Sequence, residues 1–409
     1  MANVKPFQPY RYSAKAGDPA QLITQPYDKI NPQMQARYLA ASPFNLVRVI
    51  LGEKHGTDSG ADNVYTRAAR YFEDWIQQGI LAQDPAPGFY AYFQDFQVPD
   101  TGECLTRKGF IGLGKVEDYS AGIVYRHEQT LSGPKKDRLE VLRHTRAHFG
   151  QIFMLYPDRQ GSVDRELDQA TQGGPLMAVT DEYGARHRLW AVTDPACVAR
   201  IQTLMQPMKL LIADGHHRYE TALHYRNEHP SDPAAQHVMM TFVNMYSPGL
   251  KILATHRVLR NLEKVDLLSK VTSEWAMKKT TSLTELKQEM NSSAPRSVRI
   301  GVVTANDAWL LSRPRKEGEL DVPVLHREIL GGWLGIGEDA VREEKYIQYV
   351  RGMDAAAAEV RERGAQMAFL LDPTPIDEMA RVAFAGGVMP QKSTDFYPKL
   401  LTGVAIYRL

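Results

Sequence analysis

The chain has 409 residues, 43% of them hydrophobic and 24% charged, which is an ordinary composition for a globular protein. This length predicts two or three domains whose cores need no disulfide or metal support. The formal net charge of +1 excludes a general attraction to nucleic acid or to an anionic membrane. No apolar run approaches the ~20 residues of a membrane helix, and the first residues lack the apolar core of a signal peptide. Only two cysteines occur, Cys104 and Cys197, so we expect a cytoplasmic protein without a disulfide framework.

The first eighty residues predict two helices and one strand. Asn31 is suited to cap a helix that has Pro32 at its first position. Residues 45–51 are rich in β-branched side chains and predict a strand. After Asp62, apolar residues at helical spacing predict an amphipathic helix that Gly79 can end.

Further along, short strands predominate. Residues 88–93 and 109–113 flank a turn at 100–102 and predict a meander, and residues 152–156 predict a buried strand. From about residue 262, helices alternate with strands, including a predicted hairpin over 298–311.

This mix of meanders and helices predicts an α+β, or mixed α/β, architecture and not a doubly wound sheet. We expect a catalytic core over residues 1–260 and a second α/β domain over 261–380. Residues 381–409 are expected to form a C-terminal tail that packs back toward the site, because its aromatic and apolar side chains favour burial.

The segment 210–223 carries the strongest functional signal. An apolar run of strand type ends at Asp214, and Gly215, two histidines and Arg218 follow before a helix-compatible stretch. A strand that turns at glycine into a helix presents free backbone N–H groups and the positive end of the helix dipole. With the Arg218 guanidinium added, this order predicts an anion site of the kind that binds phosphate.

Each polar residue of this turn has a candidate role. His217, Arg218 and the N–H groups around Gly215 are expected to hold the anion, and Asp214 or His216 to handle a hydroxyl proton. The structural alternative is a buried strand end whose histidines only make satisfied hydrogen bonds.

The same helix also offers a metal-binding alternative. His216, Glu220 and His224 are spaced i, i+4, i+8, which places them on one helix face. Glu220 and His224 would be the metal ligands of that face, although the zinc-protease signature is absent.

Two further polar clusters are candidates for the same site. The first contains Arg126, His127 and the candidate catalytic Glu128, and is followed by Thr130, Lys135, Lys136 and Arg138. The second lies in the tail and contains Lys392, Ser393, Thr394 and Lys399. Like charges gather where a ligand offsets their repulsion, so we expect the two clusters and the 214–218 turn to converge on one pocket.

Several enzyme classes are disfavoured by missing motifs. The chain has no Gly-rich phosphate loop of the usual form, no kinase signature set and no Gly-x-Ser-x-Gly elbow. Neither cysteine lies in a basic, polar setting, which disfavours a thiolate nucleophile.

Taken together, the motifs resemble a widespread prokaryotic family labelled as a domain of unknown function and numbered 1015. The resemblance covers essentially the whole chain and rests on long motifs: residues 25–28, 126–130, 212–222, 255–257 and 389–394. Gln25 departs from the pattern, since a second proline is expected there, and this concerns backbone shape more than chemistry.

The short stretch Gly215 to Arg218 also looks like the Gly-x-x-Arg signature of the ParB/sulfiredoxin superfamily. That resemblance implies a ParB/sulfiredoxin-like catalytic core and binding of nucleotide or phosphate by these residues. One branch of the superfamily comprises free-serine kinases, so it also implies phosphate transfer to serine or removal of phosphate from phosphoserine.

We therefore expect a phosphotransferase or phosphatase that acts on a small phosphorylated metabolite, with serine or phosphoserine as the leading candidate and ADP or ATP with Mg²⁺ as possible cofactors. Nucleic acid and membrane partners are not expected, and the sequence leaves the oligomeric state open. Two alternatives remain: a metal-dependent hydrolase using His216, Glu220 and His224, and a non-catalytic nucleotide-binding sensor.

Overall fold

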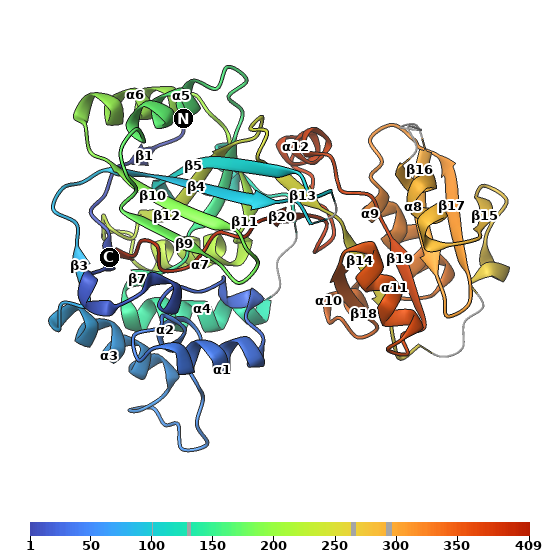
Figure 1. Ribbon diagram of the computed structural model, residues 1–409, viewed down its shortest axis with the longest axis horizontal. Helices are drawn as coiled ribbons and strands as arrows, with labels where there is room; N and C mark the ends of the chain where they lie inside the picture. Colours follow the sequence, from blue (N-terminus) through green and yellow to red (C-terminus); the bar gives the residue numbers. More distant parts are fainter. Residues whose placement is uncertain (100, 129–131, 263–266, 292–296) are drawn as a thin grey trace. The chain divides into compact units, whose positions relative to one another are not determined.

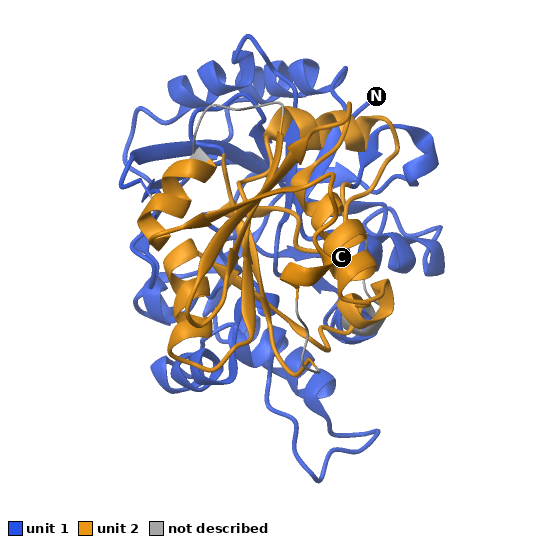
Figure 2. Ribbon diagram, turned by 90° about the vertical axis from the view of Figure 1, so that its right-hand side faces the viewer, with its two compact units in different colours: residues 1–126, 130–250, 398–409 blue, residues 127–129, 251–397 orange. Residues whose placement is uncertain are grey.

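The computed structural model describes residues 1–99, 101–128, 132–262, 267–291 and 297–409, without the side chains of 132–135 and 291. The chain forms two compact units (Figure 2). Unit 1 consists of Met1–Arg126, Thr130–Leu250 and Pro398–Leu409, and unit 2 of His127–Gln129 and Lys251–Tyr397. The expected domains over 1–260, 261–380 and 381–409 stay a prediction. None of the described helices combines the length and apolarity of a membrane span.

Unit 1 is built on a mixed sheet with the strand order β6-β11-β8-β12-β5-β4-β10-β9, and β1 pairs with β5 (Figure 1). The pairs β11–β6 and β12–β8 are parallel, and the other pairs are antiparallel. The strands of this sheet are β1 (Val4–Lys5), β4 (Phe89–Gln97), β5 (Cys104–Lys115), β6 (Val124–Tyr125), β8 (Ile152–Tyr156), β9 (Met177–Thr180), β10 (Arg186–Val192), β11 (Leu210–Asp214) and β12 (His237–Asn244).

Helices and short strands complete unit 1. The helices are α1 (Pro32–Ala41), α2 (Val47–Ile50), α3 (Val64–Gln77), α4 (Ser132–Thr145), α5 (Ser162–Ala170), α6 (Pro195–Met205) and α7 (His216–Glu228). The short elements are β2 (Tyr10–Tyr12), β3 (Leu81–Gln83), β7 (Ala147–His148), β21 (Tyr407–Arg408) and the 3-10 turns Ala14–Ala16, Pro19–Gln21, Tyr27–Lys29 and Tyr119–Ala121.

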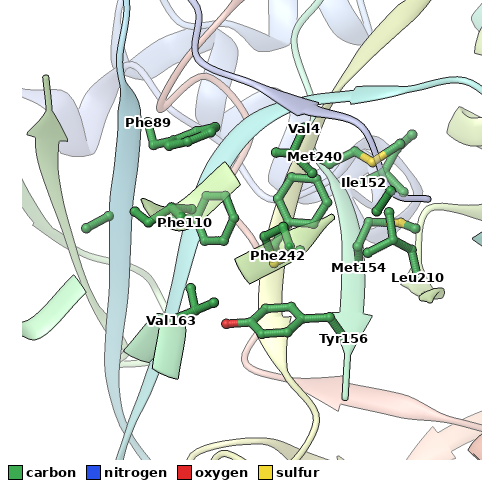
Figure 3. Close-up of a cluster of buried hydrophobic side chains, with 14 of the residues drawn as sticks. Val4, Phe89, Phe110, Ile152, Met154, Tyr156, Val163, Leu210, Met240 and Phe242 are labelled. Atoms are coloured by element: carbon green, nitrogen blue, oxygen red, sulfur yellow. The ribbon is translucent and has the colours of Figure 1, made fainter. Parts of the chain in front are cut away.

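A large hydrophobic core of unit 1 forms on one face of the sheet (Figure 3). Phe110 stacks on Phe242 with ring centroids 5.0 Å apart, and Phe89 meets Phe110 edge-on at 5.1 Å. All three rings are fully buried, so they join strands β4, β5 and β12 into one rigid surface.

Unit 2 contains an antiparallel sheet with the order β15-β17-β16-β19-β14-β18 and a small pair, β13 with β20. Its strands are β13 (Lys251–Leu253), β14 (Thr255–Leu259), β15 (Ala276–Thr280), β16 (Ser297–Val303), β17 (Ala308–Pro314), β18 (Ile347–Arg351), β19 (Met367–Leu370) and β20 (Asp395–Tyr397). Its helices are the 3-10 turn Leu268–Lys270, α8 (Leu283–Asn291), α9 (Asp321–Val324), the π-helix Leu325–Trp333, α10 (Glu338–Arg342), α11 (Met353–Arg361) and α12 (Ile376–Phe384).

The α+β, or mixed α/β, architecture is confirmed, because each unit combines sheets with helices. The predicted meander is the antiparallel pair β4–β5, and the predicted hairpin over 298–311 is β16–β17. Asn31 caps α1 by accepting a hydrogen bond from the backbone N–H of Met34.

The strand predicted over residues 45–51 is wrong, because Val47–Ile50 form the short helix α2. The Asn45 side chain accepts a hydrogen bond from the Val47 N–H and donates one to the Gln21 carbonyl. Val49 and Ile50 are buried in the same core as α3. Local capping and tertiary burial therefore override the β-propensity of this run.

Candidate functional site

The turn between β11 and α7 has the predicted order of strand, glycine and helix. β11 ends at Asp214, and Gly215 caps α7 in the left-handed region with φ 92° and ψ 29°. A Cβ at Gly215 would lie 2.9 Å from Nε and 3.0 Å from Cζ of Arg218. Glycine is thus required both for the backbone conformation and because the Arg218 guanidinium folds back onto it.

The Asp214 carboxylate lies between two cations. Its Oδ2 is 3.0 Å from Nζ of Lys399, and its Oδ1 is 3.8 Å from a terminal nitrogen of Arg218. Oδ1 also accepts a 2.7 Å hydrogen bond from the Gly215 N–H. Burial by itself would raise the pKa of Asp214, but Lys399, Arg218 and Lys29 hold that pKa well below its usual range. Asp214 is therefore ionised at any physiological pH.

Arg218 faces a cavity inside unit 1. One terminal nitrogen donates to the Gln151 carbonyl, while Nε is buried without a hydrogen-bond partner. The cavity has a volume of about 70 Å³. A second arginine, Arg138, lines it with its guanidinium 4.2 Å from the Tyr27 ring centroid. The other lining residues are Pro26, Ile50, Val141, Leu142, Ala147, His148, Phe149, Gly150, Thr221 and Thr402.

Of the predicted 214–218 site, Arg218 lines this cavity, whereas Asp214, Gly215, His216 and His217 are not among its described lining residues. No acidic side chain lines this cavity among the described residues, and two guanidinium groups do. This charge pattern suits a small anion.

The histidines lie in the first turn of α7. His216 is buried, with 8% of its surface exposed, and His217 is half-buried. The backbone carbonyl of His217 accepts a 2.8 Å hydrogen bond from the Thr221 hydroxyl. Their roles in proton transfer and anion binding stay predictions.

The proposed metal pair makes other contacts. Glu220 lies 3.5 Å from Arg126, and His224 lies 3.1 Å from Glu228. In the part of the chain that is described, no group of three or more His, Cys, Asp or Glu side chains is arranged to hold a metal.

Arg126 lies beside α7 in unit 1. Its guanidinium is 4.9 Å from the Tyr119 ring centroid. It lines a cavity of about 460 Å³ together with Tyr119, Lys136, Leu139, Glu220, Thr221, Leu223, His224 and Asn227. Thr221 lines this cavity and also the Arg218 cavity.

His127 and Glu128 join the C-terminal cluster within unit 2. Nε2 of His127 is 2.7 Å from the Thr394 hydroxyl. Glu128 accepts hydrogen bonds from the Lys392 N–H at 3.3 Å and from the N–H and hydroxyl of Thr394, both at 3.2 Å. The carbonyl of His127 accepts one from the Met389 N–H at 2.7 Å. We call His127, Glu128, Lys392, Ser393 and Thr394 the Glu128 cluster.

The Glu128 cluster continues into the 255–257 motif. Arg257 is fully buried and donates a 3.0 Å hydrogen bond to the Lys392 carbonyl, and the Ser393 hydroxyl donates to the Pro390 carbonyl at 2.6 Å. Lys392 itself has φ 57°. His127 and Glu128 of the 126–130 motif therefore meet parts of the 255–257 and 389–394 motifs in unit 2.

Within unit 2, His127 and Glu128 contact Lys392 and Thr394 of the tail cluster. Arg126, Lys136, Arg138 and Lys399 belong to unit 1, so the expected convergence of both clusters with the 214–218 turn on one pocket stays a prediction. A role of the Glu128 cluster at the 214–218 turn stays a prediction. Gln129 and Thr130 lie outside the described residues, as does the side chain of Lys135.

The sequence did not indicate that Lys399 contacts Asp214. The two residues lie 185 positions apart, and Lys399 was grouped with Lys392 because both belong to one basic tail. In the structure Lys399 belongs to unit 1 and Lys392 to unit 2.

Comparisons with known proteins give a family and loose structural likenesses. The family model "Protein of unknown function (DUF1015)" matches residues 4–350, so the chain belongs to this family. No curated protein matches the chain.

Similar solved structures include a free serine kinase variant in complex with ADP, at 11% identity and a TM-score of 0.37, covering 69% of this chain and 89% of the other. They also include a conserved hypothetical protein from Pyrococcus furiosus, at 11% identity and a TM-score of 0.36, covering 69% of this chain and 91% of the other. C-terminally truncated SbnI from Staphylococcus aureus is similar at 10% identity and a TM-score of 0.36, covering 72% of this chain and 87% of the other.

Proposed function

We propose that this DUF1015 protein transfers a phosphoryl group to or from a small hydroxyl metabolite at the turn from Asp214 to Arg218, with serine or phosphoserine as the leading substrate. The observation that carries the proposal is the ionised Asp214 held between Lys399 and Arg218 at the start of α7. Two cations and a helix N-terminus surround one carboxylate, which leaves a local excess of positive charge.

That excess suits phosphoryl transfer. The reaction needs alignment and charge neutralisation more than covalent help from the protein. An incoming phosphoryl group would compete with Asp214 for Lys399 and Arg218, and the cavity lined by Arg218 would offer it space beside that guanidinium.

The bond changes follow directly. In the kinase direction the metabolite's hydroxyl oxygen bonds to the terminal phosphorus of the nucleotide, the bond to the bridging oxygen breaks, and Asp214 or His216 takes the hydroxyl proton. In the phosphatase direction a water oxygen bonds to the phosphorus, the bond between the phosphorus and the metabolite's oxygen breaks, and a proton of that water, relayed by Asp214 or His216, ends on the leaving oxygen.

ADP or ATP with Mg²⁺ would be the nucleotide partner of the kinase direction. Asp214 fits Mg²⁺ because it is an ionised oxygen ligand, and Mg²⁺ commonly takes one or two carboxylates along with substrate phosphates. The ion would neutralise phosphate charge.

The test is turnover of serine with ATP or ADP, and of phosphoserine with water, by the purified full chain. Arg218→Ala should weaken binding of phosphoserine or ADP by calorimetry, because the anion loses a ground-state contact. Arg226→Ala is the matched control, since both arginines lie on α7 with side chains 14% exposed.

The outcomes separate the alternatives. Nucleotide binding without turnover would replace the proposal with a nucleotide sensor. Turnover that depends on a co-purified metal and is lost in His224→Ala would favour the metal-dependent hydrolase.

A further inference from the structure

The backbone around Lys399 is held by buried side chains of unit 1. The carbonyl of Pro398 accepts a 2.5 Å hydrogen bond from Arg107, and the carbonyl of Lys399 accepts one of 2.8 Å from Gln94. Two residues later, the N–H of Leu401 donates to the Tyr92 hydroxyl at 3.2 Å. These contacts fix the segment that carries Lys399.

The side chains that hold this segment form one row across three strands. Gln94 on β4 lies opposite Arg107 on β5 and opposite His187 on β10. Tyr92 lies two residues from Gln94 and therefore on the same face of β4. We call Tyr92, Gln94, Arg107 and His187 the Tyr92 network; each is at most 1% exposed.

The hydrogen bonds of this network agree with one neutral tautomer of His187. Its Nε2 is 3.2 Å from Asp181, so the ring proton lies on Nε2 and Nδ1 accepts. Nδ1 is 2.7 Å from the Tyr92 hydroxyl and 3.2 Å from the Gln94 amide nitrogen, both of which can donate. Burial lowers the pKa of His187, against the opposing effect of Asp181, which favours the neutral ring.

Gln94 completes the chain of donors and acceptors. Its Oε1 accepts from Nε of Arg107 at 2.9 Å, while its amide nitrogen donates to the Lys399 carbonyl. The guanidinium of Arg107 also lies 4.6 Å from the centroid of the Phe153 ring. Every member thus contacts another member, and the chain ends at the backbone of residues 398–401.

We propose that the Tyr92 network is a positioning network that holds the Lys399 ammonium against Asp214. A lysine side chain has four flexible bonds, so its ammonium stays at one place only if its backbone is fixed. Fully paired buried networks restrict conformation in this way. The inference rests on the proposed function only in treating the Lys399–Asp214 pair as the site.

The test measures the accessibility of Lys399 and needs no substrate. The full chain is treated with an acetylating N-hydroxysuccinimide ester, and the acetylation rate of Lys399 is followed by peptide mass spectrometry. Tyr92→Phe removes the hydroxyl that accepts from Leu401. Tyr90→Phe is the matched control, because Tyr90 is buried on the same strand and its hydroxyl donates to Asp84 instead.

We expect Tyr92→Phe to raise the acetylation rate of Lys399 about five-fold, the factor that corresponds to one net hydrogen bond, with no change in Tyr90→Phe. Equal rates in the two variants would overturn the proposal. If Tyr92→Phe does not fold, Gln94→Glu decides: it keeps an acceptor for Arg107 but removes the donor to the Lys399 carbonyl. A Lys399 rate in Gln94→Glu equal to wild type would also overturn it.

The same variants keep this inference distinct from the proposed function. Faster acetylation with no turnover of any serine compound by the wild type would keep the positioning role and reject the activity. Unchanged acetylation of Lys399 in the variants, together with turnover of phosphoserine by the wild type, would reject the positioning role and support the activity.

Discussion

Asp214 in unit 1 and Glu128 in unit 2 are both acidic residues of conspicuous polar motifs, yet the contacts around them differ. Asp214 is paired with two side-chain cations, Lys399 and Arg218, and accepts one backbone N–H, that of Gly215. Glu128 accepts two backbone N–H groups and one hydroxyl from the turn at 392–394. A ligand can compete for cationic side chains, whereas backbone donors of a turn are part of the fold.

If the proposed function holds, this difference distinguishes a chemical site at Asp214 from a structural clamp at Glu128. The Glu128 oxygens accept hydrogen bonds from groups that lose their water partners on folding. This stabilises a turn in which Lys392 has a positive φ. Asp214 shows a strongly perturbed pKa caused by specific charged partners, which is typical of functional sites. The predictions below test whether the two carboxylates can be told apart in this way.

The largest effect is expected for Asp214→Asn. Turnover of the phosphoserine couple should fall by roughly 10²–10⁴-fold, because a group that handles the reacting proton is lost. Binding of phosphoserine should change much less, since Arg218 and Lys399 remain. Steady-state kinetics and calorimetry measure the two quantities. Asp84→Asn is the control, since Asp84 is a mostly buried carboxylate paired with Arg11; a similar fall there would remove the special role of Asp214.

Glu128→Ala should act on stability first. Two part-buried backbone N–H groups lose their acceptor, and each costs less than the roughly 1–3 kcal/mol of a fully buried group left unpaired. Hydrogen exchange of peptides covering 389–397 should therefore accelerate, while exchange of β11 in unit 1 should not. Glu128→Gln keeps one acceptor oxygen and should lose less. Normal exchange in Glu128→Ala together with lost turnover would show that Glu128 has a catalytic role after all.

The turn at Asp214 was predictable because its signals are local. An apolar run, a glycine and a helix-compatible stretch follow one another within a dozen residues, and the structure has the same order. The Lys399–Asp214 pair was not predictable, because nothing in either segment specifies a partner 185 residues away.

The prediction of the fold from the sequence has the same limit: local signals are readable and long-range contacts are not. The β4–β5 meander follows from alternation and a turn signal, both of which are local. The short helix at Val47–Ile50 was missed because its conformation depends on burial against other parts of unit 1. The split of Arg126 from His127 between the units also has no sequence signal, since the two residues are adjacent.

Gly215→Ala tests how far the turn depends on the Arg218 contact. Gly161→Ala is a close control, because Gly161 caps α5 at φ 63° but a Cβ there meets nothing within 4 Å. Both variants suffer the backbone cost of a positive φ, which is about 1 kcal/mol. We expect Gly215→Ala to lose about 1–2 kcal/mol more in urea unfolding, since Arg218 must move. It should also weaken phosphoserine binding, and equal losses in the two variants would mean that Arg218 shifts freely.

The smallest expected effect is a pH dependence of the unfolding free energy that comes from His256 in unit 2 and not from Asp214 in unit 1. His256 lies beside Arg257 in unit 2, and burial, together with Arg257 and Lys287, lowers its pKa to about 3. The unfolded chain binds this proton below about pH 6.5 and the folded chain does not, so stability falls as the pH drops below 6.5. At pH 5.5 the expected loss from this residue is about 1.4 kcal/mol. Asp214 keeps its charge over the same range, because its pKa lies well below the usual value.

His256→Asn should remove that part of the pH dependence. The new side chain offers an oxygen in place of Nδ1, which accepts a 3.2 Å hydrogen bond from the Leu371 N–H. Urea unfolding at pH 7 and pH 5.5 should therefore differ by about 1.3 kcal/mol less in the variant than in the wild type, because a small part of the loss is already present at pH 7. His55→Asn, at an exposed loop position, serves as the control. If His256→Asn keeps the full wild-type difference, His256 takes up its proton in the folded state, and the acid sensitivity of unit 2 comes from other groups.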